Sequence, residues 1–469
     1  MKRFPVLLAI LAGALSAFPL DLHINPGELA SRLQDLDKGA SSLYLIGSID
    51  ARDLAALRDV PENFKTLDMK ETEVVEYRGQ LPEFPGYSIF PAGMLPDHLL
   101  FNSPFTSIAL PANITIMGKG VCANSSLLEE ATIGPGTTAI SELAFYGCPR
   151  LKKIIFPSSL ESIGSRALAE CPSLKTADLS ATRINAIPDR CFAADTSLEN
   201  VKLPSAIYSV GSEIFTGTAI TYVNLPNLKE AAPYALADMP LLQGVTLNSD
   251  ADFNIGFLMG NTKLNELAGS PTDVPDLFLA NTGAMDISSV AGNASSIGRY
   301  AFARTQLDSL ILSPSLTYVD LGAFAHAPNL NYIDARGLDS DIPDAHADAF
   351  SGINPSDIVL HVTKESEEEW KQHPVWSQFK VESATTGVDT ITSPDDSIRI
   401  LVASRHLSVS APENITDCSV WLADGTPVWK SDGHAAEINI DLPLPEGQQI
   451  LIVKVNTSSH SKTATILTR

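Results

Sequence analysis

Large apolar residues recur along this chain at a spacing much longer than one turn of a helix. Between positions 145 and 324 such a residue, often preceded by Ala, returns every 21 to 24 residues. In six of these copies an Ile or Val stands five positions earlier. Self-similarity of this period indicates a protein built from one repeated unit. The residues that mark the copies are Phe145, Leu168, Phe192, Phe215, Leu236, Phe257, Phe278, Phe302 and Phe324.

The second half of each copy has the pattern of a short β-strand. In the copy "IPDRCFAADTSLENVKLPSAI" (187–207), Val201 and Leu203 alternate with the polar residues Asn200 and Lys202. Such alternation places Val201 and Leu203 in a core and turns the polar residues outward. The Pro that follows lacks an N–H group and therefore ends the strand. We predict one strand and one short helical or irregular turn in each copy.

A single unit of this kind has no partner for its apolar face, whereas stacked copies cover one another. The predicted fold class is therefore a solenoid of parallel β-strands with short helical or irregular turns, over residues 89–383. The copies between 232 and 296 fit the consensus poorly. We expect this section to bulge or to carry a distinct surface.

Both ends of the predicted array carry segments that suit caps, which solenoids need. Residues 18–88 are predicted to form the N-terminal cap, with a strand followed by a helix that begins at Asp50 or Asp53. An earlier helix in this segment would place Leu29, Leu33 and Leu36 on one face. Residues 357–383 combine a strand with a helix that carries Trp370, followed by Trp376 and Phe379.

The consensus of the copies is I-x-x-x-A-F-x-x-C-x-x-L-x-x-I-x-L-P-x-x-L. Cys148 and Cys171 occupy its turn, and other copies have Asp195, Met239 or Ala327 there. This pattern resembles the BspA-like subfamily of leucine-rich repeats, which occurs on exported proteins of anaerobic bacteria such as the Bacteroidetes. The resemblance covers residues 89–382, and it implies a leucine-rich repeat solenoid that acts in adhesion to host proteins or other cells.

The first residues of the chain have the features of a signal peptide. Lys2 and Arg3 precede an apolar stretch from Val6 to Leu15 that is too short to span a bilayer, and small residues follow. We predict that residues 1–17 are removed on export. The expected location is the cell surface, the outer membrane or the medium, and no transmembrane helix is expected because no run reaches about 18 apolar residues.

The composition changes after the array. Residues 384–397 are small, polar and acidic, which predicts a linker. They overlap two Asp-Thr/Ser-Ile triplets, at 389–391 and 396–398, that resemble acceptors of Bacteroides-type O-glycosylation. Residues 398–469 alternate over several short stretches, with a hairpin turn at Asp424-Gly425, and this predicts a small β-sandwich. The sandwich sequence is similar to C-terminal sorting domains of type IX secretion.

The net charge of the chain limits the kinds of partner that it can bind, and its cysteine content limits the disulfide bonds that it can form. The formal net charge of −23 repels nucleic acid and anionic lipid, so neither is expected as a partner. Five cysteines in 469 residues are too few for a disulfide scaffold. We predict that Cys148 and Cys171, which hold the same slot in adjacent copies, are buried thiols.

No arrangement of residues indicates catalysis or a cofactor. The chain has no H-E-x-x-H and no C-x-x-C sequence. His361 and His373 flank a run of acids, but their spacing fits no standard metal site and the acids suit the solvated face of a helix. We therefore predict that the protein is not an enzyme, holds no metal or cofactor, and binds a protein ligand or a cell-surface glycan. The alternative is a glycan-capture or enzyme-associated module in polysaccharide degradation.

The outward positions of the strands form the candidate binding surface, on the concave face of the array. Tyr222 and Asn224 face outward because Val223 and Leu225 alternate with them. Stacking would place Lys202 one coil earlier and Thr246 one coil later. An exposed Tyr offers a large contact area at a small cost in entropy. The candidate ligand-binding residues are Lys202, Tyr222, Asn224 and Tyr332.

Overall fold

The chain folds into two compact units, Met1–Leu160 and Glu161–Arg469. The computed structural model describes residues 19–34, 40–246, 248, 250–269, 271–284, 287–338 and 341–383, and then 399–403, 406–411, 414–422, 426–431, 437–442, 449–457 and 461–468. The expected signal peptide, linker, O-glycosylation triplets and Asp424-Gly425 turn lie outside these residues or only touch them. Within the described ranges, no helix has both the length and the apolar character needed to cross a membrane.

The first unit begins with long parallel strands and short helices. Its elements are β1 (Pro19–Ile24), α1 (Leu29–Gln34), β2 (Ser42–Ile49), α2 (Ala51–Ala56), the 3-10 helix η1 (Leu57–Asp59) and β3 (Thr66–Val74), and the three strands pair side by side. Asp50 caps α2 in a capping box with Asp53, which confirms the predicted helix start. The buried Asp53 carboxylate also accepts the N–H groups of Gly27 and Leu29, so it ties the start of α1 to α2.

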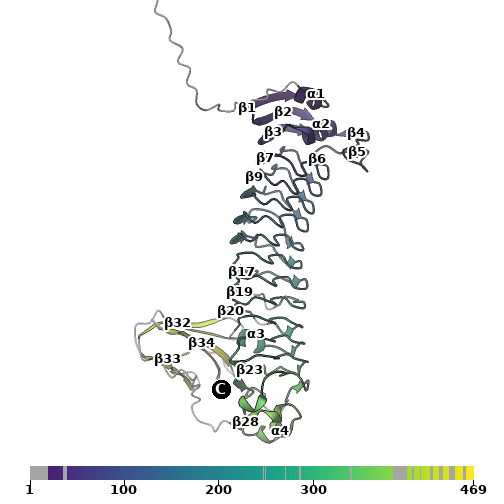
Figure 1. The fold of residues 1–469 in the computed structure, drawn as a ribbon. Coiled ribbons are helices and arrows are strands. Elements are labelled where there is room, and N and C mark those ends of the chain that lie inside the picture. Colours follow the sequence, from purple (N-terminus) through teal and green to yellow (C-terminus); the bar gives the residue numbers. More distant parts are fainter. Residues whose placement is uncertain are drawn as a thin grey trace, which may run out of the picture. The chain divides into compact units, whose positions relative to one another are not determined.

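Most coils that follow contain two short strands (Figure 1). In the first unit one row consists of β7 (Ser107–Ala109), β9 (Glu130–Thr132) and β11 (Lys153–Ile155), and the other of β6 (Met94–Leu95), β8 (Ile116–Met117) and β10 (Ala139–Ile140), after a small antiparallel pair of β4 (Tyr77–Arg78) and β5 (Ile89–Phe90). The chain is a β-solenoid of about 15 turns with little helix, which confirms the predicted fold class. The half of each copy that was expected to be helical or irregular also contains a second, shorter strand.

The second unit also contains a row of longer strands and a row of two-residue strands. The longer strands are β13 (Thr176–Asp178), β15 (Asn200–Lys202), β17 (Tyr222–Asn224), β19 (Gly244–Thr246), β20 (Glu266–Ala268), β23 (Ser309–Ile311), β25 (Tyr332–Asp334), β27 (Val359–Val362) and β28 (Lys380–Ser383). The two-residue strands are β12 (Ser162–Ile163), β14 (Ala186–Ile187), β16 (Ser209–Val210), β18 (Glu230–Ala231), β21 (Asp273–Val274), β22 (Ser296–Ile297), β24 (Tyr318–Val319) and β26 (Asp344–Ala345). All pairings within these rows are parallel, as predicted.

The turns between the two rows depend on residues with left-handed backbone. In one coil Arg190 and Ala194 have φ angles of 53° and 64°, and they flank the Cys-Phe pair that begins the turn. Glycine holds the same two positions in another coil, at Gly256 and Gly260. Most copies carry other residue types there and so accept a conformation that costs L-residues roughly 1 kcal/mol or more.

Ala194 offers a direct test of this cost. We expect Ala194→Gly to raise the free energy of unfolding by about 1 kcal/mol, because glycine adopts positive φ without a steric penalty. The neighbouring Ala193 does not have a positive φ angle. Ala193→Gly is the matched control, and it should lower stability because glycine only adds freedom to the unfolded chain there. Urea unfolding of both variants checks the prediction, and a loss of stability in Ala194→Gly would contradict it.

The core is a ladder of large apolar side chains that repeat once per coil. Phe302, Phe324 and Phe350 stack with ring centroids 5.4 and 5.2 Å apart. The copies marked by Phe257 and Phe278 depart from the expected register. Left-handed residues at 256 and 277 place these two rings in the slot that Ala fills elsewhere, while Leu258 and Leu279 occupy the ladder slot and are fully buried.

The poorly matched section keeps its coils but changes one of them. The helix α3 (Ser288–Ala291) lies between β20 and β23 in the chain and contacts both strands. Ile287 and Val290 are buried there, so the short helix supplies the core in place of a strand. The described array ends with β27, the 3-10 helix η2 (Pro355–Asp357) just before it, α4 (Glu367–Gln372), the 3-10 helix η3 (Trp376–Gln378) and β28. Trp370 and Trp376, which the sequence places in this segment, are fully buried.

The C-terminal residues form two antiparallel sheets. One contains β29 (Arg399–Ala403), β30 (His406–Ser410) and β33 (Glu437–Asp441), and the other β32 (Pro427–Ser431), β31 (Ile415–Leu422), β34 (Gln449–Thr457) and β35 (Ser461–Thr468). Leu407 and Val409 of the first sheet share a core with Val420, Leu451 and Val453 of the second. The predicted β-sandwich is therefore confirmed.

Candidate ligand-binding face

The outward residues of the longer strands form one surface, which we call the strand face. In the second unit Asn200 and Lys202 of β15 and Tyr222 and Asn224 of β17 are all exposed, as the alternation predicts. Val223 between them is buried. Three of the four candidate residues therefore lie on two consecutive longer strands.

Among the large hydrophobic residues that the structure describes, Tyr222 is the most exposed, at 56%. Its ring lies against the next strand, where a Cβ on Gly244 would come within 2.6 Å of the ring. The hydroxyl lies 3.4 Å from Oε1 of Gln243 and 3.5 Å from Oε1 of Glu266, and it can donate to either. Gly244 is buried beneath this ring, so this position of β19 offers no surface of its own.

Lys202 is held by an ion pair on the same face. Its Nζ lies 3.1 Å from Oδ2 of Asp178 on the preceding strand β13. Hydrogen bonds from the side chain and backbone of Ser180, followed by that from Lys202, lower the pKa of Asp178. Both charged side chains are more than half exposed, so the pair contributes little stability and Lys202 can turn toward a ligand.

Tyr332, the fourth candidate, lies apart from the other three and is only half-buried rather than exposed. Its ring packs edge-on against His361 with centroids 5.1 Å apart, and its hydroxyl lies 3.1 Å from Nδ1 of that His. The next outward residue, Asp334, is buried, and its carboxylate accepts two hydrogen bonds from the guanidinium group of Arg336. The strands β19, β20 and β23 separate Tyr332 from Tyr222 along the row.

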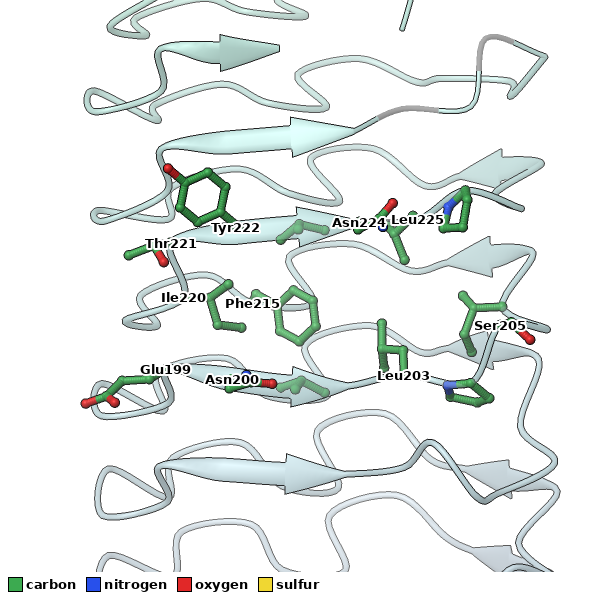
Figure 2. A pocket seen from close by; sticks show the side chains of 15 residues that line it. Glu199, Asn200, Leu203, Ser205, Phe215, Ile220, Thr221, Tyr222, Asn224 and Leu225 are labelled. Carbon is green, nitrogen blue, oxygen red and sulfur yellow. The ribbon is translucent and has the colours of Figure 1, made fainter. Parts of the chain in front are cut away.

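A cleft opens in the strand face between β15 and β17 (Figure 2). The cavity has a volume of about 500 Å³, with Phe215 and Ile220 among the residues that line it. Val201 and Leu203, which the sequence places in the core, line this cavity and are only half-buried. The two side chains face inward as predicted but are less buried than a core position implies, because β17 does not pair with β15 to cover them.

The spacing of the repeat carries no signal for this cleft. Both coils match the consensus, and on the other side of the solenoid their two-residue strands β14 and β16 remain paired. Figure 2 shows Asn200 on one side of the opening and Tyr222 and Asn224 on the other. The candidate residues of the strand face therefore surround a hollow with an apolar floor and polar edges.

The histidines considered as metal ligands have other partners. His361 contacts Tyr332 and lies 3.5 Å from Glu382, while Nδ1 of His373 accepts the N–H of Val375. Among the residues that the structure describes, no group of three or more His, Cys, Asp or Glu could hold a metal ion.

The cysteines are buried thiols, which confirms the prediction for Cys148 and Cys171. Burial raises the pKa of Cys122 well above its usual value, with a smaller contribution from Cys148. Burial and then Asp195 raise the pKa of Cys191 in the same way. A raised pKa and a buried sulfur make such thiols poor nucleophiles.

These coils, with two short parallel strands and one aromatic or leucine ladder, define a leucine-rich repeat solenoid. A family model described as BspA type leucine rich repeat region (6 copies) matches residues 95–148, 115–243 and 273–369, which is more than half of the chain. The chain belongs to this family of BspA-type leucine-rich repeat proteins. The unmatched residues between 243 and 273 fall within the section that fits the consensus poorly.

Solved structures of bacterial leucine-rich repeat proteins are similar to this chain. A leucine-rich repeat protein from Bacteroides ovatus is 18% identical, with 64% of this chain and 89% of that chain covered and a TM-score of 0.43. A leucine rich cell surface protein from Faecalibacterium prausnitzii is 20% identical, with 64% and 85% covered and a TM-score of 0.37. The pneumococcal vaccine antigen PcpA is 15% identical, with 74% and 80% covered and a TM-score of 0.28. No curated protein matches the chain.

Proposed function

We propose that this chain is an exported binding protein without catalytic activity, which attaches to host proteins or to other cells through its strand face. The observation that supports this function best is the exposed set of Asn200, Lys202, Tyr222 and Asn224 around the cleft. Aromatic and amide groups beside an apolar hollow suit contacts with a protein ligand. Tyr332 would add a second contact further along the row.

Export is part of the proposal. Residues 1–17 would direct the chain out of the cytoplasm. The exported protein would then lie at the cell surface, in association with the outer membrane or in the medium. The similarity of residues 398–469 to type IX sorting domains supports a role of the C-terminal sandwich in that step. The similar chain from Faecalibacterium prausnitzii is a cell surface protein, and we propose the same location for this one.

A binding measurement with Tyr222→Ala tests the strand face. We expect the variant to bind immobilised extracellular-matrix proteins about tenfold more weakly than the parent, because a central aromatic contact contributes roughly 1–2 kcal/mol. Folding should not change, since the ring covers only the surface of Gly244. Surface plasmon resonance across a panel of matrix proteins, with a glycan array in parallel, measures the effect. Signal on the array alone would favour the glycan-capture alternative.

Tyr208→Ala is the matched control for this measurement. Tyr208 is 44% exposed and precedes β16, so it lies outside the row of longer strands. Its removal should leave binding unchanged. Tyr332→Ala should weaken binding less than Tyr222→Ala, because the ring is half-buried against His361. Equal binding by the parent and Tyr222→Ala, at equal thermal stability, would reject the strand face as the site.

A further inference from the structure

The cleft between β15 and β17 leaves two strand edges open toward each other. In the closed ladder between β13 and β15, the N–H of Asn200 donates to Lys175 and the carbonyl of Lys202 accepts from Leu179. The outward residues of β15, Asn200 and Lys202, therefore direct their N–H and C=O groups toward β13 in the preceding coil. Because these directions alternate along a strand, Val201 and Leu203 direct their backbone groups toward β17 in the following coil. Across the described residues 199–226, no backbone hydrogen bond or strand pairing joins β15 to β17.

The same alternation identifies the open groups on β17. The N–H of Gly244 donates to Thr221, so Tyr222 and Asn224 direct their N–H and C=O groups toward β15. The two edges together present four donors and four acceptors at strand spacing. Open edges of this kind are templates for another strand, because their backbone groups are left without a partner.

We propose that the cleft binds an extended peptide, which inserts as an additional strand between β15 and β17. The proposal rests on and deepens the binding function above by naming the ligand class. Backbone hydrogen bonds on both sides would give affinity, and alternate side chains would enter the cavity and give specificity. The half-buried Val201 and Leu203 and the buried floor at Phe215 and Ile220 favour small or apolar inward side chains.

Charge favours a basic residue at one end of the peptide. Glu199 lines the cleft where β15 begins, and among the described residues it forms no ion pair. The equivalent residue in an earlier coil is Glu129, whose Oε2 accepts from Nζ of Lys152 on the next coil at 2.8 Å. An inserted strand with Lys at that position would repeat this contact at Glu199. Such a strand would begin with a basic residue. After it, polar residues would alternate with small or apolar residues.

The sequence of β13 and its flanks, Ser-Leu-Lys-Thr-Ala-Asp-Leu-Ser (173–180), has this pattern and provides a defined probe. In register, its Lys would lie beside Glu199, and its Ala and second Leu would face the cavity. We expect the acetylated, amidated and dye-labelled octapeptide to bind the whole chain saturably in fluorescence anisotropy. In the free protein, the amides of Tyr222 and Asn224 are expected to exchange their hydrogens faster than the amide of Thr246. Binding of the peptide should protect the amides of Tyr222 and Asn224 from this exchange.

Two altered peptides test the contacts without changing the protein. Methylation of the Ala nitrogen removes the N–H group that would donate to β17, and we expect roughly tenfold weaker binding. Replacement of the Lys by Glu places like charge beside Glu199 and should weaken binding to a similar extent, with the loss reduced at high salt.

Val201→Trp tests the site from the protein side, because the larger side chain fills the cavity. We expect this variant to bind the octapeptide at least about tenfold more weakly than the parent does. Ser162→Trp is the matched control, since it adds the same side chain at an exposed position of the two-residue strand β12, outside the strand face, and should leave affinity unchanged. The thermal transition of each variant shows whether it is folded.

Insertion is overturned if the octapeptide shows no saturable binding up to about 1 mM, a concentration that corresponds to only about −4 kcal/mol. It is also overturned if the parent binds the N-methyl peptide equally well. A chain that binds the octapeptide but no matrix protein or glycan rejects the adhesive function alone. A chain that binds matrix protein through Tyr222 and ignores the octapeptide rejects the insertion alone.

Discussion

Asp195→Asn is expected to stabilise the protein at neutral and alkaline pH and to remove a large pH dependence of folding. Asp195 is fully buried in the turn slot that Cys148 and Cys171 fill in earlier coils. Its Oδ1 accepts the N–H of Cys171 at 2.7 Å, while its Oδ2 is buried without a hydrogen-bond partner. Burial raises the pKa of this carboxyl to about 9.

The chain itself shows what an amide does in this slot. Asn261 occupies the equivalent position, and its Oδ1 accepts the N–H of Met239 at 2.8 Å. Its Nδ2 donates to the carbonyls of Leu236 and Leu258. Asparagine at 195 would keep the bond from the preceding coil and donate to the carbonyls at the corresponding positions, and it would carry no charge. All of its polar atoms would then be satisfied.

The sign of the pH effect follows from the raised pKa. Below about pH 4 the carboxyl is protonated in both the folded and the unfolded chain, so it carries no ionisation penalty. Between about pH 4 and pH 9 the unfolded chain loses the proton that the folded chain retains, and stability falls by about 1.4 kcal/mol per unit. Above about pH 9 the full penalty is present.

We therefore expect Asp195→Asn to match the parent near pH 4 and to exceed it by roughly 2–4 kcal/mol in unfolding free energy at pH 7–8. Urea unfolding of both proteins from pH 4 to pH 8.5 measures this difference. Asp178→Asn is the control, because it removes the same charge from an exposed carboxylate whose pKa is lowered. It should give no gain in stability at high pH. Parallel pH profiles of the parent and Asp195→Asn would show that Asp195 is ionised in the folded chain.

The repeat and the start of α2 could be predicted because they depend on local sequence. The spacing of apolar residues determines which side chains meet in the ladder, and Asp50 caps α2 through residues within three positions of itself. The register at Phe257 and Phe278 could not be predicted from apolar spacing alone. A left-handed residue begins each turn, and in these two coils a Phe follows it directly where Ala usually stands.

The candidate site was predictable only in part. Alternation along β17 is sufficient to expose Tyr222 and Asn224. The burial of Tyr332 depends on His361, which lies 29 residues away in sequence, and the period of the repeat carries no information on that pair. The cleft is a property of two coils together. Val201 and Leu203 have the composition of core residues, and only the missing pairing with β17 leaves them half-buried.

Phe324→Ala is expected to be the most destabilising single change in the second unit. Phe324 is fully buried and stacks between Phe302 and Phe350, with ring centroids 5.4 and 5.2 Å away. Phe350 in turn contacts Trp376 of η3, with ring centroids 5.4 Å apart. Removing the middle ring leaves a cavity between three coils, so we expect a loss of about 3–5 kcal/mol in unfolding free energy.

The loss should be concentrated in the coils that follow, because each coil of a solenoid is stabilised mainly by its neighbours. Hydrogen exchange should therefore show reduced protection in β25 and β27, with β13 and β19 unchanged. Phe324→Leu is the matched control, since Leu168 and Leu236 fill the same ladder slot and are fully buried. A leucine there should cost only about 1 kcal/mol. Equal losses in the two variants would mean that the buried volume of this side chain does not account for its contribution to stability.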